Sequence, residues 1–329
     1  MEATFGARAA TQRGTDADVV ICVSPALIGS AMVLARLRMA WHRPALGLWV
    51  QDLYSRGVVE AAQASHVMAE AARVYEGTVA HLADGVAVVH DRFANYVSLR
   101  LYLSPDRVTV IRNWTHLRDA VPADRVETRR RLGWAHDEVI ALHAGNMGAK
   151  QGLENLVDAA RLAEETGRRV TVVLLGGGNQ QAALKQRAEG LQNIRFLASL
   201  PGRDFQDALA AADVLLVNER PGVLEMSVPS KLTSYYTSGR PVLAATGAGT
   251  VTAHEIELSG AGIRVDPGSP AALLAGVDRL VSSPVLSAEL VRNAGRFLSE
   301  VLSEEAALDQ FELWMDKLIS RRAEKDSRS

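Results

Sequence analysis

The chain has 329 residues, of which 48% are hydrophobic, and a formal net charge of −2. This is enough for one large domain or two ordinary ones, and the near-neutral charge argues against broad nucleic-acid binding, which needs a basic surface. Cys22 is the only cysteine, which excludes an intrachain disulfide and a cysteine-based zinc site. Residues 1–18 contain no apolar run of signal-peptide length, and no run in the sequence reaches the ~20 residues of a membrane span. We therefore expect a cytoplasmic protein.

The first half of the sequence alternates between short apolar runs and helical segments. Residues 1–15 are predicted to be a loose polar lead-in. Strands are predicted at 19–23, 46–50, 86–89 and 108–111, with helices at 26–40, 58–82 and 91–103. Residues 26–43 have an apolar body and a basic end, a pattern compatible with peripheral contact at the inner face of a membrane. A helix packed on a sheet is the plainer interpretation.

The second half repeats this pattern after a polar segment at 115–137, where we place the domain boundary. The predicted domains are residues 1–120 and 121–329. Strands are predicted at 139–142, 170–175, 194–197, 214–217, 242–245 and 263–265, with a helical end at 270–325. Strands that are apolar on both faces and separated by helices indicate parallel sheets covered on both sides. An Ala-Asp pair precedes a strand at 17–18, 83–84 and 212–213, which indicates two α/β units of similar build.

The stretch around residue 230 has the pattern of an anion-binding element. Pro229 and Ser230 are a helix start signal, with Ser230 as the N-cap, and Gly239 fits a helix C-cap. Lys231 falls in the first helical turn, where the helix dipole disfavours a cation. A bound anion would remove this penalty, because free N–H groups and an ammonium group together bind phosphate. The alternative is a solvated surface lysine, since the penalty is only about 0.3–1 kcal/mol.

Two glycine-rich segments follow predicted strands. The glycines of 145–152 would let backbone N–H groups approach a ligand, and Lys150 adds charge, but the segment lacks the spacing of a Walker A loop. A tight turn between strand and helix is the alternative. Gly176–Gly178 suggests a dinucleotide site, but no third glycine follows at the required spacing. The eight histidines form no metal-binding motif, so we predict no metal site.

The segment Pro229–Ala244, with Pro-Ser-Lys at its start and Gly-Arg-Pro near its end, resembles the nucleotide-sugar segment of family 4 glycosyltransferases with the GT-B fold. Ala144–Gly148, Trp49–Leu53 and Asn113–Trp114 support the match. The resemblance is closest to the capsule and exopolysaccharide branch, which includes colanic-acid type enzymes, and covers roughly residues 16–320. It implies an α/β protein with two Rossmann-like domains and a sugar donor site in the second.

The resemblance also implies which residues bind a donor linked to UDP, GDP or dTDP. The helix start at Ser230 and Lys231 would hold the diphosphate, and the glycine loop at 145–152 would contact the same phosphates. The implied donor-binding residues are Gly145, Asn146, Lys150, Gln151, Glu225, Ser230, Lys231 and Ser234. No metal or cofactor is implied to be needed, since lysines and a helix N-terminus can stabilise the departing diphosphate. No catalytic residue is identified.

The sequence departs from the family at several of these positions. Ser234 stands where many relatives carry the second glutamate of an E-x7-E motif, and Glu225 is one residue from the place of the first. The relatives' basic residues in the glycine loop appear here as Asn146 and Gln151. The phosphate charge would therefore be matched by lysines at 150 and 231.

Relatives also begin with several strand–helix units that precede the segment aligned with Asp18. We therefore expect an incomplete first domain with an exposed apolar sheet edge, of the kind that another chain can pair with.

The resulting interpretation is a retaining, hexosyltransferase-like enzyme that transfers a sugar to a growing, lipid-linked glycan in surface polysaccharide synthesis. One alternative is an inactive GT-B-like binding or scaffold subunit that needs a partner chain, which a turnover assay would distinguish. A second is a Rossmann oxidoreductase, favoured only by Gly176–Gly178 and tested by a nicotinamide titration.

Overall fold

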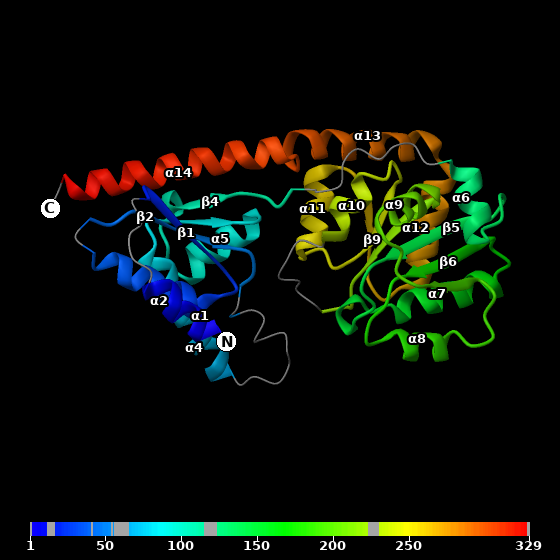
Figure 1. Ribbon diagram of the computed structural model, residues 1–329. Coiled ribbons are helices and arrows are strands. Elements are labelled where there is room, and N and C mark those ends of the chain that lie inside the picture. Colours follow the sequence, from blue (N-terminus) through cyan, green and yellow to red (C-terminus); the bar gives the residue numbers. More distant parts are fainter. Residues whose placement is uncertain are drawn as a thin grey trace. The chain divides into compact units, whose positions relative to one another are not determined.

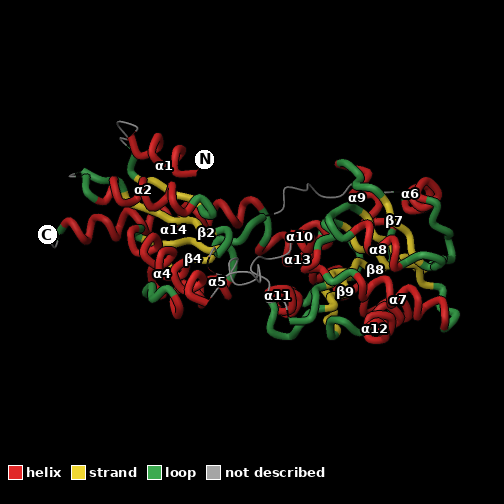
Figure 2. Tube along the Cα trace, turned by 90° about the horizontal axis from the view of Figure 1, so that it is seen from below, coloured by secondary structure: helices red, strands yellow, loops and turns green. Residues whose placement is uncertain are grey.

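The computed structural model describes residues 2–11, 17–40, 42–53, 55, 66–114, 124–222 and 230–327. The chain divides into two compact units, unit 1 with residues 1–114 and 304–329 and unit 2 with residues 115–303 (Figure 1). Each unit contains one parallel sheet, drawn in yellow in Figure 2 with helices in red around it. The predicted α/β class is confirmed.

Unit 1 has a four-stranded sheet in the order β1-β2-β3-β4, all parallel. The strands are β1 (Val19–Val23), β2 (Ala45–Val50), β3 (Gly85–Val88) and β4 (Val108–Val110), the last preceded by η1 (Pro105–Arg107). One face of the sheet packs against α2 (Leu27–Arg38), α4 (His66–Leu82) and α5 (Asp91–Arg100). Leu46, Leu48, Val86 and Val88 are buried in this layer.

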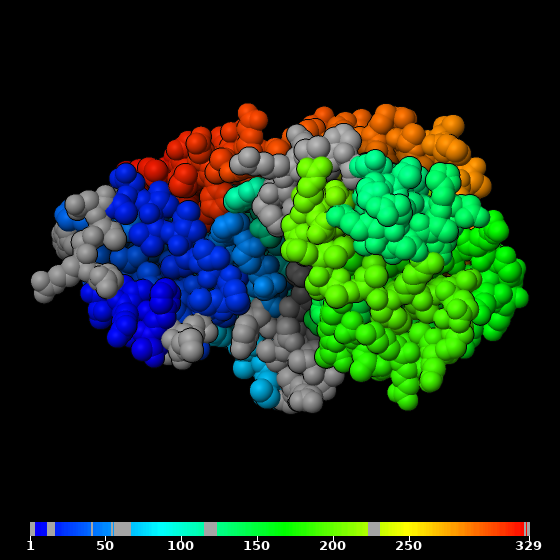
Figure 3. Space-filling view, turned by 45° about the vertical axis from the view of Figure 1, so that its right-hand side comes forward, coloured from blue at the N-terminus to red at the C-terminus, as the bar shows by residue number. Residues whose placement is uncertain are grey.

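The predicted polar lead-in is wrong, because residues 2–11 form helix α1 (Glu2–Thr11). This helix packs on the outside of α2 and is part of the dark blue surface in Figure 3. Two glycines allow the close approach: a Cβ on Gly6 would lie 2.6 Å from the Cα of Gly29. Sequence reasoning missed α1 because it has only a few apolar residues and packs through small ones.

The opposite face of the unit 1 sheet packs against the C-terminal helix α14 (Glu304–Asp326), drawn in red in Figure 1. Trp314 and Leu318 are fully buried there. They lie over Gly47 and Gly85, where an added Cβ would come within 2.8 Å of Trp314 and Leu318 respectively. The units therefore divide the chain differently from the predicted domains: residues 304–329 belong with the first sheet, and the boundary falls after Trp114.

Unit 2 has a six-stranded parallel sheet in the order β10-β9-β8-β5-β6-β7. Its strands are β5 (Val139–Ala144), β6 (Val170–Leu175), β7 (Ile194–Leu197), β8 (Val214–Asn218), β9 (Val242–Ala245) and β10 (Gly262–Val265). β5 pairs with β6 on one side and with β8 on the other. The order of the strands therefore reverses at β5, and ligands of open α/β sheets bind at the carboxyl ends of strands at such a point.

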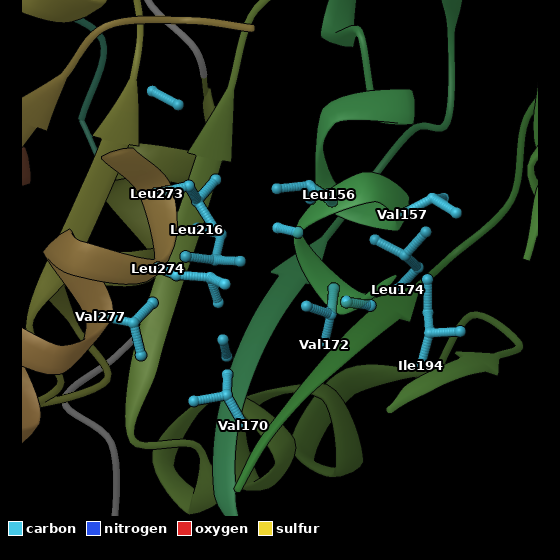
Figure 4. Packing of buried hydrophobic residues seen from close by; sticks show 14 of the residues in the cluster. Leu156, Val157, Val170, Val172, Leu174, Ile194, Leu216, Leu273, Leu274 and Val277 are labelled. Carbon is cyan, nitrogen blue, oxygen red and sulfur yellow. The ribbon is translucent and has the colours of Figure 1, made fainter. Parts of the chain in front are cut away.

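Helices cover both faces of this sheet. One face carries α7 (Glu154–Glu165), α8 (Gln181–Arg187) and α12 (Pro270–Ser282), and Figure 4 shows Leu156, Leu273 and Val277 from these helices directed at Val172 and Leu216 of the strands. The other face carries α6 (Arg125–Leu132), α9 (Gly202–Ala211), α10 (Ser230–Tyr236), α11 (Val251–Ser259) and α13 (Pro284–Val301). The three-layer build explains why the strands are apolar on both faces.

Two of the three Ala-Asp pairs noted in the sequence, at 83–84 and 212–213, have the same structural role, one in each unit. A carboxylate oxygen of Asp84 accepts the backbone N–H of Leu46 at 3.0 Å, and one of Asp213 accepts the N–H of Ile140 at 2.8 Å. Each carboxylate also pairs with arginines, Arg43 for Asp84 and Arg129 for Asp213. Each aspartate thus joins the start of its own strand to the start of a neighbouring one.

No single described helix has the length and apolar content needed to cross a bilayer. The pair formed by residues 270–282 and 284–325, which is bent between its two parts, meets that test on length and composition only. Its first helix, α12, has its apolar face in the core of unit 2.

Candidate functional site

The glycine loop after β5 lies at the point where the strand order of unit 2 reverses. Gly145 follows the last residue of β5 and has φ of +136°, a conformation that favours glycine. Its N–H donates to the carbonyl of Leu175 at 2.9 Å, and the N–H of Met147 donates to the carbonyl of Gly177 at 2.8 Å. The loop after β5 is therefore held by the loop after β6.

The contact between these two loops accounts for the glycines at 176 and 178. A Cβ on Gly176 would lie 2.2 Å from the carbonyl oxygen of Gly145, and one on Gly178 would lie 2.5 Å from that of Met147. Both glycines also have positive φ, +129° and +153°. They are required because two backbone loops meet without room for a side chain, a role that the sequence pattern did not distinguish from a dinucleotide motif.

The structure brings Lys231 to this loop. Helix α10 begins at Ser230, so Lys231 lies in the first turn as predicted. Its Cε and Nζ atoms lie 3.8 and 3.9 Å from the position that a Cβ on Gly145 would take. Two segments about 85 residues apart in the sequence, each predicted to bind phosphate, therefore meet at one place.

His143, in β5, is buried beside the same lysine and carries no charge into the site. Its Nδ1 lies 3.2 Å from the carbonyl oxygen of Leu216, so this nitrogen is the donor. Burial, reinforced by the positive charge of Lys231, holds the pKa of His143 well below its usual range. The imidazole is therefore neutral near pH 7, and the lysine is the cation at this point of the loop.

The side chains of Gln151 and Asn146 lie against the backbone of the two glycine loops. The N–H of Gly148 donates to Oε1 of Gln151 at 3.1 Å, which closes the short helix η2 (Ala149–Gln151). Oδ1 of Asn146 lies 2.6 Å from the position that a Cβ on Gly178 would take. The side-chain carbonyl of Gln151 is thus directed at the loop backbone, and its contact with a phosphate stays a prediction.

The remaining predicted donor residues are placed as follows. Lys150 lies in η2, and Ser234 is half-buried on α10, one turn after Lys231. Ser230 opens α10, but its side chain is not among those described, and Glu225 lies outside the described residues. Gly239 has φ of +67°, but α10 ends at Tyr236, so this glycine ends the turn that follows the helix and is not its C-cap.

Two polar residues at the end of β8 were missed by the sequence reasoning. The Nδ2 of Asn218 donates to the carbonyls of Gln151 and Gly152, at 2.7 and 2.9 Å, which ties β8 to the glycine loop. The carboxylate of Glu219 is buried and accepts hydroxyl hydrogen bonds from Thr246 and Thr252, which follow β9 and begin α11. The signal available in the sequence was an Asn-Glu pair directly after a buried strand.

A pocket of about 460 Å³ borders the end of the glycine loop. Its lining includes Gly152, Asn155, Gln180 and Arg220, but neither Gly145 nor the residues of α10. We therefore base the site on the meeting of α10 with the glycine loop, where the cation and the glycine backbone converge.

Tyr235 fixes α10 to the glycine loop. Its hydroxyl accepts the backbone N–H of Ala144, the last residue of β5, at 2.8 Å, and lies 3.2 and 3.3 Å from the carbonyls of Ala144 and Leu216. The ring is fully buried, and burial raises the pKa of the phenol above its usual value. The sequence pattern alone does not indicate this bond.

We expect Tyr235→Phe to destabilise unit 2 by about 1–3 kcal/mol, because it leaves a buried N–H unpaired. Denaturant unfolding measures this cost. Tyr236→Phe is the matched control, since its hydroxyl bonds to Ser259, away from the loop. A loss of affinity for nucleoside diphosphates in Tyr235→Phe alone would indicate that the tyrosine positions α10; equal binding by both variants would contradict that role.

Comparison with known proteins identifies the unit that holds this site. Residues 138–283 match the family model described as glycosyl transferases group 1. The chain carries a group 1 glycosyltransferase domain. This domain covers the unit 2 sheet, both glycine loops and α10, so the predicted resemblance is confirmed in the part of the chain that holds the site.

Curated proteins that resemble this chain include two bacterial glycosyltransferases. The putative colanic acid biosynthesis glycosyl transferase WcaI of Escherichia coli is 27% identical over 74% of this chain and 60% of its own length. The probable glycosyltransferase WbjE of Pseudomonas aeruginosa is 26% identical over 66% of this chain and 54% of its own length. The chain thus spans less than two thirds of the length of these relatives.

Solved structures share the fold. Anabaena HepE in complex with UDP-glucose has a TM-score of 0.72, with 18% identity over 97% of this chain and 82% of that one. WaaG, a glycosyltransferase involved in lipopolysaccharide biosynthesis, has a TM-score of 0.60, with 18% identity over 93% of this chain and 92% of that one. The two Rossmann-like sheets are therefore those of the GT-B fold, as the sequence predicted.

Proposed function

We propose that this protein is a retaining glycosyltransferase that binds the diphosphate of a nucleotide sugar in unit 2. The observation that carries the proposal is the position of the Lys231 ammonium against Gly145, at the carboxyl edge of the sheet where the strand order reverses. An ammonium beside a glycine loop and a helix start is suited to a diphosphate. Solved structures with the same fold include complexes with UDP and UDP-glucose, which supports this donor class.

In the proposed reaction, the bond between the anomeric carbon of the sugar and the diphosphate oxygen breaks, and the oxygen of an acceptor hydroxyl forms the new glycosidic bond to that carbon. The nucleoside diphosphate leaves, and the hydroxyl proton is released. Charge develops on the departing diphosphate in the transition state. Lys231 is placed to stabilise this charge, because a fixed cation costs no reorganisation when the bond breaks. The buried, neutral His143 behind the loop adds no competing charge.

We further propose that the acceptor is a lipid-linked glycan of surface polysaccharide synthesis. The support is the similarity to WcaI, a putative glycosyl transferase of colanic acid biosynthesis. Incubation with UDP-, GDP- and dTDP-sugars and a lipid-linked acceptor extract, followed by detection of the released nucleoside diphosphate, tests turnover. The anomeric configuration of the product, measured by NMR, tests retention. Donor binding without turnover on any acceptor would favour the alternative of a binding subunit.

Lys231→Ala is expected to weaken binding of the preferred nucleoside diphosphate by roughly tenfold or more, since a hydrogen bond to a charged group contributes about 1.5–3 kcal/mol. Calorimetry on the full chain with UDP, GDP and dTDP measures this. Lys150→Ala should have the smaller effect, because Lys150 lies in η2 rather than at the start of α10.

Lys185→Ala, on α8 over the ring of Phe196, is the control and should bind like the parent. If none of the three nucleotides binds the parent at millimolar concentration, the donor site is wrong. If Lys231→Ala binds as tightly as Lys185→Ala, the role of Lys231 is wrong although the donor class can stand.

A further inference from the structure

The helices of unit 1 have an apolar side that faces away from the sheet. α1 packs on α2, α2 packs beside α4, and α2, α4 and α5 cover the same face of the sheet. Of the large apolar side chains exposed in the described part of the chain, more than half belong to these four helices or lie within two residues of their ends. Exposed apolar surfaces of this kind mark contacts with another protein or with a membrane.

Helix α2 is apolar on both of its sides. Leu27 and Leu34 on the inner side are buried in the core of unit 1. The outer side carries Ile28, Met32 and, at the C-cap, Met39, which are 45%, 37% and 82% exposed. Separations of four and seven residues put these three on one side of the helix. Because helices that are apolar all round are normally buried, the composition of α2 indicates that its outer side is covered by an apolar partner.

The neighbouring helices extend this apolar side. At the contact between α1 and α2, Sδ of Met32 lies 3.2 Å from the position that a Cβ on Gly6 would take, and Cδ1 of Phe5 lies 3.8 Å from that of Gly29. Phe5 is itself 66% exposed. On α4, exposed apolar residues recur seven positions apart, at Val67 and Val74 and at Met68 and Tyr75. We call the combined exposed surface of α1, α2 and α4 the outer face of unit 1.

Three exposed arginines border the outer face: Arg8 on α1, Arg36 on α2 and Arg100 at the end of α5. None of them has an ion pair with the residues that the structure describes. Arg8 follows Phe5 by three residues and Arg36 follows Met32 by four, so each lies beside an exposed apolar residue of its own helix. Unpaired positive charge and apolar side chains therefore alternate along α1 and α2.

The carboxylates of these helices do not match the three arginines. Glu70 of α4 is paired with Arg73, and Asp91 of α5 is paired with Arg112 at 2.6 Å, while Glu76 is buried. An apolar surface bordered by unpaired arginines is complementary to a bilayer with anionic headgroups. A second copy of the chain fits less well, because a two-fold axis would bring two positively charged faces together.

We propose that the outer face of unit 1 binds the surface of a membrane that contains anionic lipid. The apolar side chains of α1, α2 and α4 would enter the boundary between headgroups and acyl chains, and the arginines would pair with lipid phosphates. The dark blue surface in Figure 3 shows the α1 and α2 part of this face. Its benefit for catalysis rests on the proposed function, since a lipid-linked acceptor would be available at the same membrane.

Vesicle flotation of the full chain tests the proposal, with vesicles of phosphatidylcholine alone or mixed with phosphatidylglycerol. Ile28→Gln and Met39→Gln each remove an apolar side chain from the outer face, and Arg36→Gln removes a charge. Val285→Gln and Arg292→Gln are the matched controls, because both residues are exposed on α13 in unit 2. Circular dichroism melts check folding, and the high exposure of Met39 keeps the test decisive if Ile28→Gln is unstable.

The parent should float with vesicles that contain phosphatidylglycerol and far less with phosphatidylcholine alone. We expect roughly tenfold weaker partitioning for Ile28→Gln and Met39→Gln, since each loses the burial of one apolar side chain. Arg36→Gln should lose about fivefold, and only with the anionic vesicles. Both controls should float like the parent. Calorimetry with UDP should give the same affinity for all five variants, so the donor site and the membrane surface are tested separately.

Absence of flotation by the parent would overturn the proposal, as would equal losses in Val285→Gln and Arg292→Gln. Light scattering on a size-exclusion column examines the second copy as the occupant. A parent dimer that Met39→Gln converts to a monomer, together with no flotation, would assign the outer face to self-association and not to lipid.

Discussion

Gly176→Ala is expected to cost unit 2 about 3 kcal/mol or more and to abolish nucleoside diphosphate binding. The added methyl group would lie 2.2 Å from the carbonyl oxygen of Gly145, which is backbone and cannot rotate away. Alanine would also have to adopt φ near +129°, a strain of order 1–3 kcal/mol by itself. A shift of the glycine loop would relieve both the close contact and the backbone strain. This shift would move Gly145 away from Lys231.

Gly177→Ala is the matched control for this substitution. The neighbouring glycine has no atom within 4 Å of its added Cβ and no positive φ, so its replacement should change the free energy of unfolding by less than about 0.5 kcal/mol. Denaturant melts and UDP calorimetry compare the two variants. If both behave like the parent, the contact between the two loops does not hold the donor site.

The positions of the strands and of the start of α10 could be predicted because their signals are local. Apolar runs such as Val170–Leu175 are buried on both faces, and Lys231 stands out as a cation in a first helical turn. The function of Gly176–Gly178 could not be read in the same way, because the sequence shows glycines without showing which backbone approaches them. The bond from Tyr235 to Ala144 was hidden for a similar reason: it joins residues 91 positions apart.

The assignment of the last helix to the first sheet depends on packing that no local pattern contains. Phe311, Trp314 and Leu318 recur at helical spacing, which indicates a buried face but not the sheet that buries it. The informative residues were far away, at Gly47 and Gly85, two glycines at paired positions of neighbouring strands. Glycines inside strands often mark a close approach by another element, and here they accommodate the indole of Trp314.

Trp314→Ala is therefore expected to destabilise unit 1 by about 3–5 kcal/mol, the usual cost of removing a large aromatic side chain from a core. The indole is only 1% exposed, and Phe311, beside it at 5.8 Å between ring centroids, packs edge-on against Trp49 of β2 at 4.8 Å. Glycines beneath the indole have no side chains that could fill the cavity. For a unit of this size, the corresponding fall in melting temperature is roughly 10 °C.

Leu313→Ala provides the control for Trp314→Ala, since it shortens the preceding, exposed residue of the same helix. Calorimetric melts should show the transition of unit 1 lowered in Trp314→Ala and nearly unchanged in Leu313→Ala. Limited proteolysis should then cleave residues 304–327 first in Trp314→Ala, because α14 is held to the sheet mainly through Trp314 and Leu318. Equal melting and equal cleavage of the two variants would mean that the helix is held by its ionic contacts with Asp84 and Asp106 and not by the buried aromatic.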